Sequence, residues 1–364
     1  EKLEEAFNSL KDNFFLTFSC YNIKMLKIDV LVAGSTGYIG IQLIKLLVNH
    51  KNVNIKYLCG NNSVGKNISI YDVKLKNKNL PKIIKFKHKL LKNVDIIFTA
   101  LPNGEAQKIS KKLLKKNTLI DLAADFRLEK ASEYLKWYKQ KHKAPNLIKK
   151  SIYSLPEISG DKIKDYQIIG CPGCYPTSIL LPLIPLLKKN LIKKDNIIID
   201  SKSGYSGAGK DVHKKYKNKN LYESLSAYGV GFHRHNSEIQ QMLNKSVGGK
   251  LKFTFTPHLS PMFRGILSTI YVDINKGKSI NNLYNEIDKF YKKSNFVKMV
   301  KLNSFIGTNN VINTNNCEIS ICKSKYKDKA VILSSIDNLI KGGAGQAIQN
   351  MNILKNFKEF EGLK

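Results

Sequence analysis

Hydrophobic residues in the first half of the chain fall into short runs separated by amphipathic segments. The runs 28–33, 94–100 and 118–122 are mostly apolar, which is typical of strands buried on both faces of a parallel sheet. Residues 41–47 instead carry apolar side chains at helical spacing. This alternation continues to about residue 170 and predicts an α/β fold with a doubly wound parallel sheet of the Rossmann type.

The pattern changes in the second half of the chain. Residues 251–256 and 266–272 alternate in polarity, as strands do when only one face is buried. They predict an α+β region with a largely antiparallel sheet, followed by a helix over 338–357. A length of 364 residues also favours two domains.

A glycine-rich segment joins the first predicted strand to the first predicted helix. Strand, glycine loop and helix in this order form the setting of a dinucleotide-binding turn, where backbone N–H groups meet a pyrophosphate. The spacing is G-x-x-G-x-x-G, and a glycine loop without this setting is a weak signal. The candidate cofactor-binding residues are Gly34, Ser35, Thr36, Gly37, Tyr38, Ile39 and Gly40.

The next strand, 55–59, ends where an NAD-specific site usually offers an acidic residue to the ribose. Residues 60–66 contain no acid, while Ser63 and Lys66 are suited to a 2′-phosphate. The segment therefore favours NADP(H) over NAD(H), although an ordinary polar loop has the same composition.

Cys174 follows a Pro-Gly turn and precedes an apolar helix over 179–187. The N–H groups and dipole of a helix N-terminus lower the pKa of a thiol, which favours an attacking thiolate. The segment also permits a buried structural cysteine. A third interpretation is a redox pair, because Cys171 and Cys174 form C-x-x-C.

Two histidines near Glu238 are candidates for acid/base catalysis, and Glu238 itself is a candidate substrate contact. His233 and His235 are two residues apart, so in an extended segment both side chains lie on one face. The sequence does not choose between them; we take His235 as the acid/base and His233 as a substrate contact. His258 is a third candidate.

A glycine-rich loop over 203–209 follows another predicted strand. It is suited to bring N–H groups to a leaving phosphate or an oxyanion, with Ser203 as a substrate contact. Other glycine-rich turns look similar.

The net charge of +33 raises the question of nucleic-acid binding. The lysines are scattered through every segment, and Asn and Ile are abundant too, so a bias toward AT-rich codons explains the charge more simply.

Only three of the 61 basic residues are arginines, namely Arg127, Arg234 and Arg264. We infer that they mark positions where the guanidinium fork is needed. Arg234 and Arg264 are assigned to substrate carboxylate and phosphate, and Arg127 either to substrate or to a structural ion pair.

The six cysteines show no metal-ligand spacing apart from the Cys171–Cys174 pair and no secreted disulfide pattern, so we predict no metal site and a reducing, cytoplasmic location. No apolar run is long enough to span a membrane. Residues 1–24 begin with acidic residues and do not look like a secretion or transit peptide; we expect an extension outside the folded domains.

Ten motifs in order along the chain resemble the N-acetyl-γ-glutamyl-phosphate reductase family from about Met25 onward. They lie at 34–40, 101–104, 121–128, 154–157, 172–177, 201–209, 233–235, 256–259, 261–266 and 337–346. Two departures are Asn103, where the family often has His, and Cys171, where another residue is common.

The resemblance implies NADPH-dependent reduction of an acyl phosphate through a Cys174 thioester, in arginine biosynthesis. It implies that Asn338 holds the nicotinamide carboxamide and that Pro102 lies at the cofactor. It also implies a homodimer or homotetramer. Residues 25–170 and 335–364 would form the NADP-binding domain, and 171–334 the catalytic and dimerisation domain.

Sibling enzymes remain the nearest alternatives: aspartate-semialdehyde dehydrogenase and the reductase of a carrier-linked aminoadipyl phosphate. Non-enzymatic alternatives are a thiol redox or metal protein built on Cys171 and Cys174, and a nucleic-acid-binding protein. The redox alternative requires both cysteines equally and leaves the glycine loop unexplained.

Overall fold

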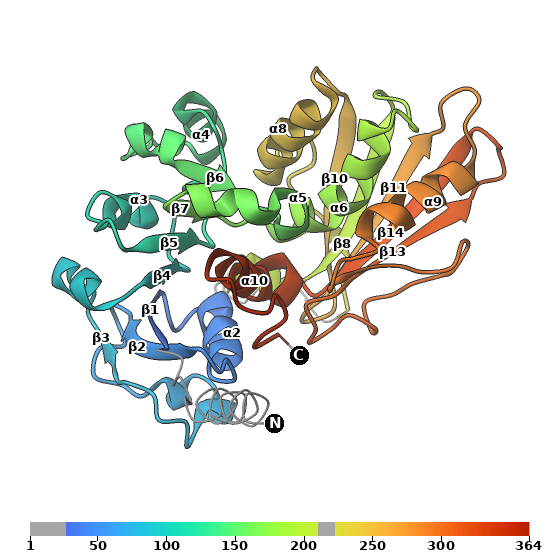
Figure 1. Ribbon diagram of the computed structural model, residues 1–364. Coiled ribbons are helices and arrows are strands. Elements are labelled where there is room, and N and C mark those ends of the chain that lie inside the picture. Colours follow the sequence, from blue (N-terminus) through green and yellow to red (C-terminus); the bar gives the residue numbers. More distant parts are fainter. Residues whose placement is uncertain (1–26, 210–222, 364) are drawn as a thin grey trace, which may run out of the picture.

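A computed structural model describes residues 27–209 and 223–363. Two seven-stranded sheets lie side by side, and the C-terminal helix lies between them (Figure 1). The predicted extension over 1–24 is outside the described residues.

The first sheet is parallel throughout, with strand order β3-β2-β1-β4-β5-β7-β6. Its order reverses at β1, and such a switch point opens a crevice at the carboxyl ends of the strands. The doubly wound parallel sheet is therefore confirmed. The strands are β1 (Ile28–Ala33), β2 (Val53–Cys59), β3 (Ile83–Ile84), β4 (Ile96–Thr99), β5 (Thr118–Asp121), β6 (Ser151–Tyr153) and β7 (Ile168–Gly170).

Short helices connect these strands. The α-helices are α2 (Tyr38–Leu47), α3 (Glu105–Ser110), α4 (Ala131–Tyr138) and α5 (Pro156–Ser159). The 3₁₀ segments are η1 (Ile68–Ile70), η2 (Val73–Leu75), η3 (His88–Asn93), η4 (Pro145–Lys150) and η5 (Gly160–Asp165).

The second sheet is mixed, with strand order β12-β13-β14-β11-β8-β10-β9. Four of its six strand pairs are antiparallel, and β8–β10 and β12–β13 are parallel. The largely antiparallel sheet is thus confirmed. Its strands are β8 (Ile197–Gly204), β9 (Ser226–Ala227), β10 (Phe253–Ser260), β11 (Ile266–Asp273), β12 (Val297–Met299), β13 (Cys317–Lys323) and β14 (Lys329–Ile336).

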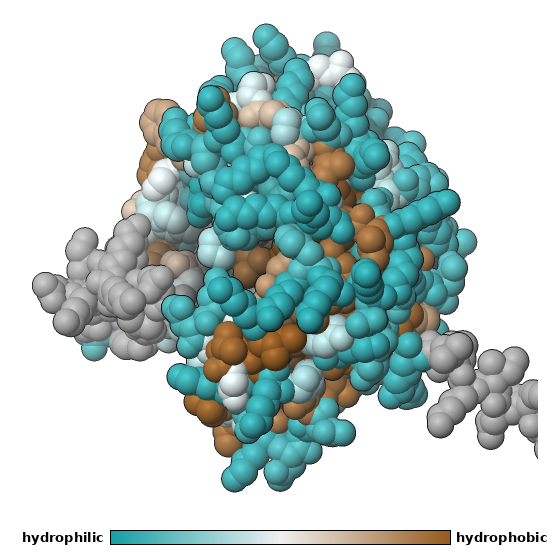
Figure 2. Space-filling view, turned by 90° about the vertical axis from the view of Figure 1, so that its left-hand side faces the viewer, coloured by the Kyte–Doolittle hydropathy of each residue, from teal (hydrophilic) through white to brown (hydrophobic). Residues whose placement is uncertain are grey.

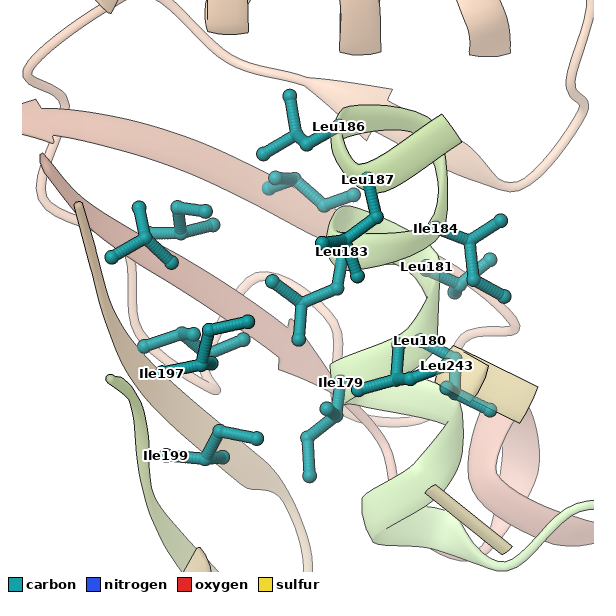
Figure 3. Close-up of a cluster of buried hydrophobic side chains, with 14 of the residues drawn as sticks. Ile179, Leu180, Leu181, Leu183, Ile184, Leu186, Leu187, Ile197, Ile199 and Leu243 are labelled. Carbon is teal, nitrogen blue, oxygen red and sulfur yellow. The ribbon is translucent and has the colours of Figure 1, made fainter. Parts of the chain in front are cut away.

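Helices α6 (Cys174–Lys188), α8 (His235–Val247) and α9 (Ile280–Tyr291) build the core of the second domain, and η6 (Tyr205–Ala208) follows β8. Apolar side chains of α6 face Ile197 and Ile199 of β8, with Leu243 of α8 beside them (Figure 3). The alternate β8 residue Ile198 is exposed, so one face of this sheet is buried. Burial on every side explains why α6 is apolar all round.

The chain returns to the first domain at its end. A π-helical turn, η7 (Ile340–Ala344), leads into α10 (Gly345–Leu354). Ala347, Ile348 and Met351 of α10 pack in the same core as Val30 and Phe98 of the first sheet. The first domain is therefore completed by a segment far away in sequence.

Candidate active site

One cavity of about 640 Å³ links the glycine loop to Cys174. It opens at the switch point of the first sheet and reaches the N-termini of α6 and α8 in the second domain. Its lining residues are Thr36, Gly37, Tyr38, Ile39, Gly40, Asn62, Ser63, Tyr71, Ala100, Leu122, Arg127, Gly173, Cys174, Ser206, Gly207, Gly209, His235, Asn338, Leu339, Gly342 and Gly343.

Two residues of the glycine loop, Gly34 and Gly40, lie so close to neighbouring backbone that no side chain fits there. Gly34 has φ +83°, and a Cβ there would overlap the carbonyl of Ala100. A Cβ on Gly40 would overlap the Gly34 carbonyl. Ser35 is buried and donates to the Cys59 carbonyl at 3.1 Å, so it supports the loop and does not line the cavity.

Helix α2 begins at this loop with Gly37 as its N-cap and no side-chain cap. An uncapped helix N-terminus at a cavity is suited to an anion such as a pyrophosphate. The cavity therefore fits the dinucleotide predicted for this loop.

The part of the cavity lined by Asn62, Ser63 and Tyr71 is polar. Ser63 is buried and accepts a hydrogen bond from the Tyr71 hydroxyl at 2.7 Å, and Asn62 lies beside it in the lining. Lys66 is exposed and is not among the lining residues, contrary to its predicted 2′-phosphate contact. The nearby Asp72, beyond the acid-free segment 60–66, pairs with Lys45 at 3.0 Å.

Cys174 is the first residue of α6, and its N-cap Gly173 provides no side-chain cap. Burial raises the pKa of the Cys174 thiol to about 11, while the Arg127 charge and backbone N–H groups at the start of α6 act to lower it. Desolvation therefore opposes the depression of this pKa that the helix N-terminus predicts.

His235 is the histidine that the structure brings to Cys174. A Cβ on Gly173 would overlap the His235 ring, and both residues line the cavity. Burial, followed by the charges of His233, Arg127 and Arg234, holds the pKa of His235 well below its ordinary value. Burial therefore favours the neutral imidazole, whose unprotonated ring nitrogen is a hydrogen-bond acceptor.

His233 lies behind His235 and outside the cavity lining. Its Nδ1 accepts the backbone N–H of His235 at 3.2 Å, and its ring makes edge contacts with Tyr175, Tyr228 and Phe255. Burial and the Arg234 charge lower its pKa to about 4. The third candidate, His258, has its Nδ1 3.1 Å from Asp200 on the second sheet. These contacts place both histidines in supporting positions.

Glu238 is fully buried and already bonded to protein donors. It accepts from Arg127 Nη1 at 2.9 Å, from the Tyr153 hydroxyl at 3.2 Å and from the Gly173 N–H at 2.9 Å. Its Oε1 is 3.9 Å from His235 Nε2. The predicted substrate contact is thus replaced by a role in holding the cavity wall.

The three arginines occupy different environments. Arg127 lines the cavity, and its Nη2 donates to the Leu122 carbonyl at 3.0 Å. Arg264 does not line it, and its two Nη atoms donate to Gln42, Asn313 and Asp337 at 2.6–3.1 Å. Arg234 is exposed and lies 5.6 Å from the Tyr138 ring centroid.

Arg127 therefore makes the structural ion pair and also lines the cavity, so its substrate contact stays a prediction. The fork of Arg264 is engaged by the protein, which is contrary to the predicted phosphate contact.

Asn338 meets the second glycine-rich loop at the cavity. Its Oδ1 accepts the Gly265 N–H at 2.7 Å, and its Nδ2 donates to Ser206 Oγ at 3.0 Å. Ser203 is buried outside the lining and donates to the Gly204 carbonyl at 3.1 Å, so Ser206 takes the place predicted for it. Pro102 is exposed after β4 and is also outside the lining.

Sequence reasoning assigned no role to Gly342 and Gly343, which line the cavity. The Lys-Gly-Gly-Ala-Gly run was the available signal, because clustered glycines mark a close backbone approach.

Cys171 lies in the core of the first domain, where its sulfur accepts from Asn350 Nδ2 at 3.7 Å. Burial raises the pKa of the Cys171 thiol to about 12. All five cysteines within 27–209 and 223–363 are free, and no group of three or more His, Cys, Asp or Glu side chains there could hold a metal ion. Cys171 and Cys174 therefore lie in different environments.

Figure 2 shows one face covered largely by hydrophilic side chains, with smaller apolar areas between them. Among the described helices, none combines the length and apolarity needed to cross a lipid bilayer.

Two family models match the chain. The NAD binding domain of semialdehyde dehydrogenases matches residues 29–166, and the dimerisation domain of semialdehyde dehydrogenases matches residues 174–338. The nucleotide-binding loop and the cysteine helix thus fall within the two matched regions.

Similar proteins extend over almost the whole chain. The N-acetyl-gamma-glutamyl-phosphate reductase of Clostridium beijerinckii (strain ATCC 51743 / NCIMB 8052) is 44% identical over 341 residues, covering 93% of this chain and 98% of that protein. The reductase of Brachyspira hyodysenteriae (strain ATCC 49526 / WA1) is 43% identical over 345 residues, covering 92% and 98%.

Among solved structures, aspartate semialdehyde dehydrogenase II from Vibrio cholerae superimposes with a TM-score of 0.67 at 15% identity, covering 91% of this chain and 99% of that one. This likeness shows a shared fold. The sequence identities and both domain matches together show that the chain belongs to the N-acetyl-γ-glutamyl-phosphate reductases of the semialdehyde dehydrogenase family.

Proposed function

We propose that the protein reduces N-acetyl-L-glutamyl 5-phosphate to N-acetyl-L-glutamate 5-semialdehyde and phosphate with NADPH, in arginine biosynthesis. One observation carries the proposal: a single cavity joins a dinucleotide-binding loop to a cysteine at a helix N-terminus, with His235 in the same lining and against the adjacent Gly173. The printed activity of relatives 43–44% identical supports the choice of substrate.

Cys174 is the proposed nucleophile. As the Cys174 sulfur forms a bond to the γ-acyl carbon, the thiol proton passes to the His235 imidazole. The bond from the acyl carbon to the phosphate oxygen breaks, and phosphate leaves with the electron pair. The Arg127 guanidinium and the uncapped N–H groups of α6 face the same space and stabilise negative charge there.

When bound, NADPH would supply the hydride that reduces the carbonyl carbon of the resulting thioester. His235 then gives its proton to the carbonyl oxygen, which completes a thiohemiacetal on Cys174. For release, His235 removes that proton again, the C=O bond reforms and the C–S electron pair returns to sulfur. The last proton transfer, from His235 to the thiolate, restores both side chains.

One residue is assigned to the nicotinamide end of the cofactor and one to the carboxylate of the substrate. Asn338 lines the cavity near Cys174 and is proposed to bind the nicotinamide carboxamide. Arg234, exposed beside His235, is proposed to bind the substrate carboxylate.

The preference for NADPH over NADH rests on the polar end of the cavity. Asn62, Ser63 and Tyr71 line it without a carboxylate, and the nearby Asp72 is paired with Lys45. A 2′-phosphate finds hydrogen-bond donors there and no repelling lone anion.

The proposed location is a reducing, cytoplasmic compartment, and the proposed assembly is a homodimer. The match to a dimerisation domain supports the dimer. So does the exposed face of the second sheet, opposite the face that buries Ile197 and Ile199. On that face Ile198 and Tyr271 are register partners and are 43% and 46% exposed. Tyr271→Asp should dissociate the dimer in light-scattering measurements, and an unchanged mass would exclude this face.

Phosphate-dependent reduction of NADP⁺ with N-acetylglutamate semialdehyde tests the activity directly. Parallel assays with aspartate semialdehyde and the aminoadipate semialdehyde derivative separate the sibling enzymes. A clear preference for either alternative aldehyde would overturn the substrate assignment.

A further inference from the structure

The π-helical turn η7 touches the residue that carries the proposed nucleophile. A Cβ added to Gly342 would lie 2.6 Å from Cys174 Cβ and 3.0 Å from its Cα. The backbone of η7 therefore packs directly on Cys174, and a shift of the turn would move or release the thiol. π-Helical turns are rare and occur often at functional sites.

The residue before Gly342 points into the protein and carries a charge. Lys341 is fully buried; its Nζ pairs with Glu157 of α5 and donates to Gln349 Oε1 of α10 at 2.9 Å. Gln349 Nε2 also donates to Glu157 Oε1 at 2.8 Å, and the ammonium lies 5.5 Å from the Phe296 ring centroid. Lys341 is thus fixed on several sides by α5 and α10.

A second connection runs from the turn to α6. Gln346 Nε2 donates to the Lys341 carbonyl and to Thr177 Oγ1, both at 3.1 Å. Thr177 Oγ1 in turn donates to the carbonyl of Gly173, the residue before Cys174, at 3.0 Å. Hydrogen bonds therefore lead from Lys341 to the start of the cysteine helix.

A buried ion pair is a poor means of gaining stability. Replacing such a pair by uncharged residues is often neutral or stabilising, whereas removing one partner is strongly destabilising. Stability alone does not explain a lysine in this position. A pair that fixes one arrangement of α5, η7 and α10 against α6 does explain it.

We propose that Lys341 is a positioning residue for Cys174: through its pair with Glu157 it fixes the η7 turn, and the turn fixes the orientation of the thiol. This proposal rests on the proposed function for the role of Cys174 in catalysis. Lys341 itself is outside the cavity lining, so its effect reaches the thiol through Gly342 and Gln346.

The central experiment compares Lys341→Met with the double variant Lys341→Met/Glu157→Gln. The single variant leaves a buried carboxylate unpaired, so its melting temperature should fall; the double variant should recover it. We expect kcat of the double variant to remain about 10- to 100-fold low with KM changed less, because small misplacement of a reacting group is costly. Its rate of Cys174 alkylation by iodoacetamide should also depart from wild type across pH 7–10.

Asn352→Ser provides a matched control on the same helix. Asn352 is buried and bonded to His50 at 2.8 Å, but it is not part of the connection to η7. This variant should lower the melting temperature and leave kcat and the alkylation profile unchanged. If the double variant regains kcat and alkylation together with its melting temperature, Lys341 is only structural and the proposal is wrong.

Thr177 tests the same connection without changing a buried charge, in case the Lys341 variants do not fold. Thr177→Val should lower kcat and alter Cys174 alkylation, and Thr177→Ser should restore both; a folded Thr177→Val variant with wild-type values would overturn the proposal. Alkylation is measured without substrate. A failure of the proposed function would instead appear as reductase activity retained in Cys174→Ala.

Discussion

Glu238 accepts the backbone N–H of Gly173 at 2.9 Å, although 65 residues separate the two positions. The bond ties the first turn of α8 to the turn that presents Cys174. Because Glu238 also pairs with Arg127, one buried carboxylate joins the histidine helix, the cysteine turn and the cavity arginine.

Glu238→Gln should disturb all three connections at once. The amide cannot neutralise Arg127, and breaking a buried ion pair costs about 3–5 kcal/mol. We expect a melting temperature lower by several degrees and a reduced kcat, measured by calorimetry and steady-state kinetics. Glu129→Gln is the control, since the Glu129–Lys245 pair is exposed. Equal effects of the two changes would contradict the role given to Glu238.

Cys174→Ala should abolish reductase activity and leave NADPH binding intact, because the glycine loop lies in the other domain. Cys171→Ser should retain most activity, since the Cys171 thiol is buried in the core of the first domain. Activity assays and cofactor fluorescence titration measure the two properties. Loss of activity in Cys171→Ser at an unchanged melting temperature would favour the redox pair.

Alkylation of Cys174 in the cofactor-free protein should accelerate steeply with pH. Burial raises the thiol pKa to about 11, so the thiolate is a small fraction at pH 7 and increases about tenfold per pH unit until the pKa is approached. Iodoacetamide labelling followed by peptide mapping gives the profile. A plateau near pH 7 would show that the helix N-terminus outweighs desolvation after all.

Arg264→Lys should weaken NADPH binding more than substrate binding. Arg264 joins Gln42 of α2 to Asp337, and its neighbour Gly265 donates to Asn338. A lysine cannot reach these acceptors together, and losing a charge-assisted bond costs roughly 1.5–3 kcal/mol, or about ten- to a hundredfold in affinity. Lys289→Ala, at an exposed position, is the control. An effect on the acyl-phosphate KM alone would restore the phosphate contact inferred from the sequence.

Asn62→Asp should shift cofactor preference from NADPH toward NADH. The new carboxylate would face the space assigned to the 2′-phosphate and lower NADPH affinity by roughly tenfold. The adjacent Asn61→Asp is a matched control, because Asn61 does not line the cavity. Fluorescence titration with both cofactors checks the change. If Asn61→Asp has the same effect, the 2′-phosphate lies elsewhere.

The fold class and two chemical features, the glycine loop and the Cys174 turn, could be predicted from the sequence alone. Apolar runs indicated the strands of the first sheet, because a parallel strand covered on both faces is mostly apolar. The glycine loop and the Cys174 turn were recognisable because backbone geometry restricts which residues can form them.

Tertiary structure decided which candidates meet. His235 lines the cavity beside Gly173, whereas His233 is outside the lining and its ring packs against Tyr228 and Phe255. Arg264 and Glu238 are bonded by partners far away in sequence, which no local pattern shows. The raised thiol pKa of Cys174 also depends on burial, because desolvation is a property of the packed molecule and not of a sequence segment.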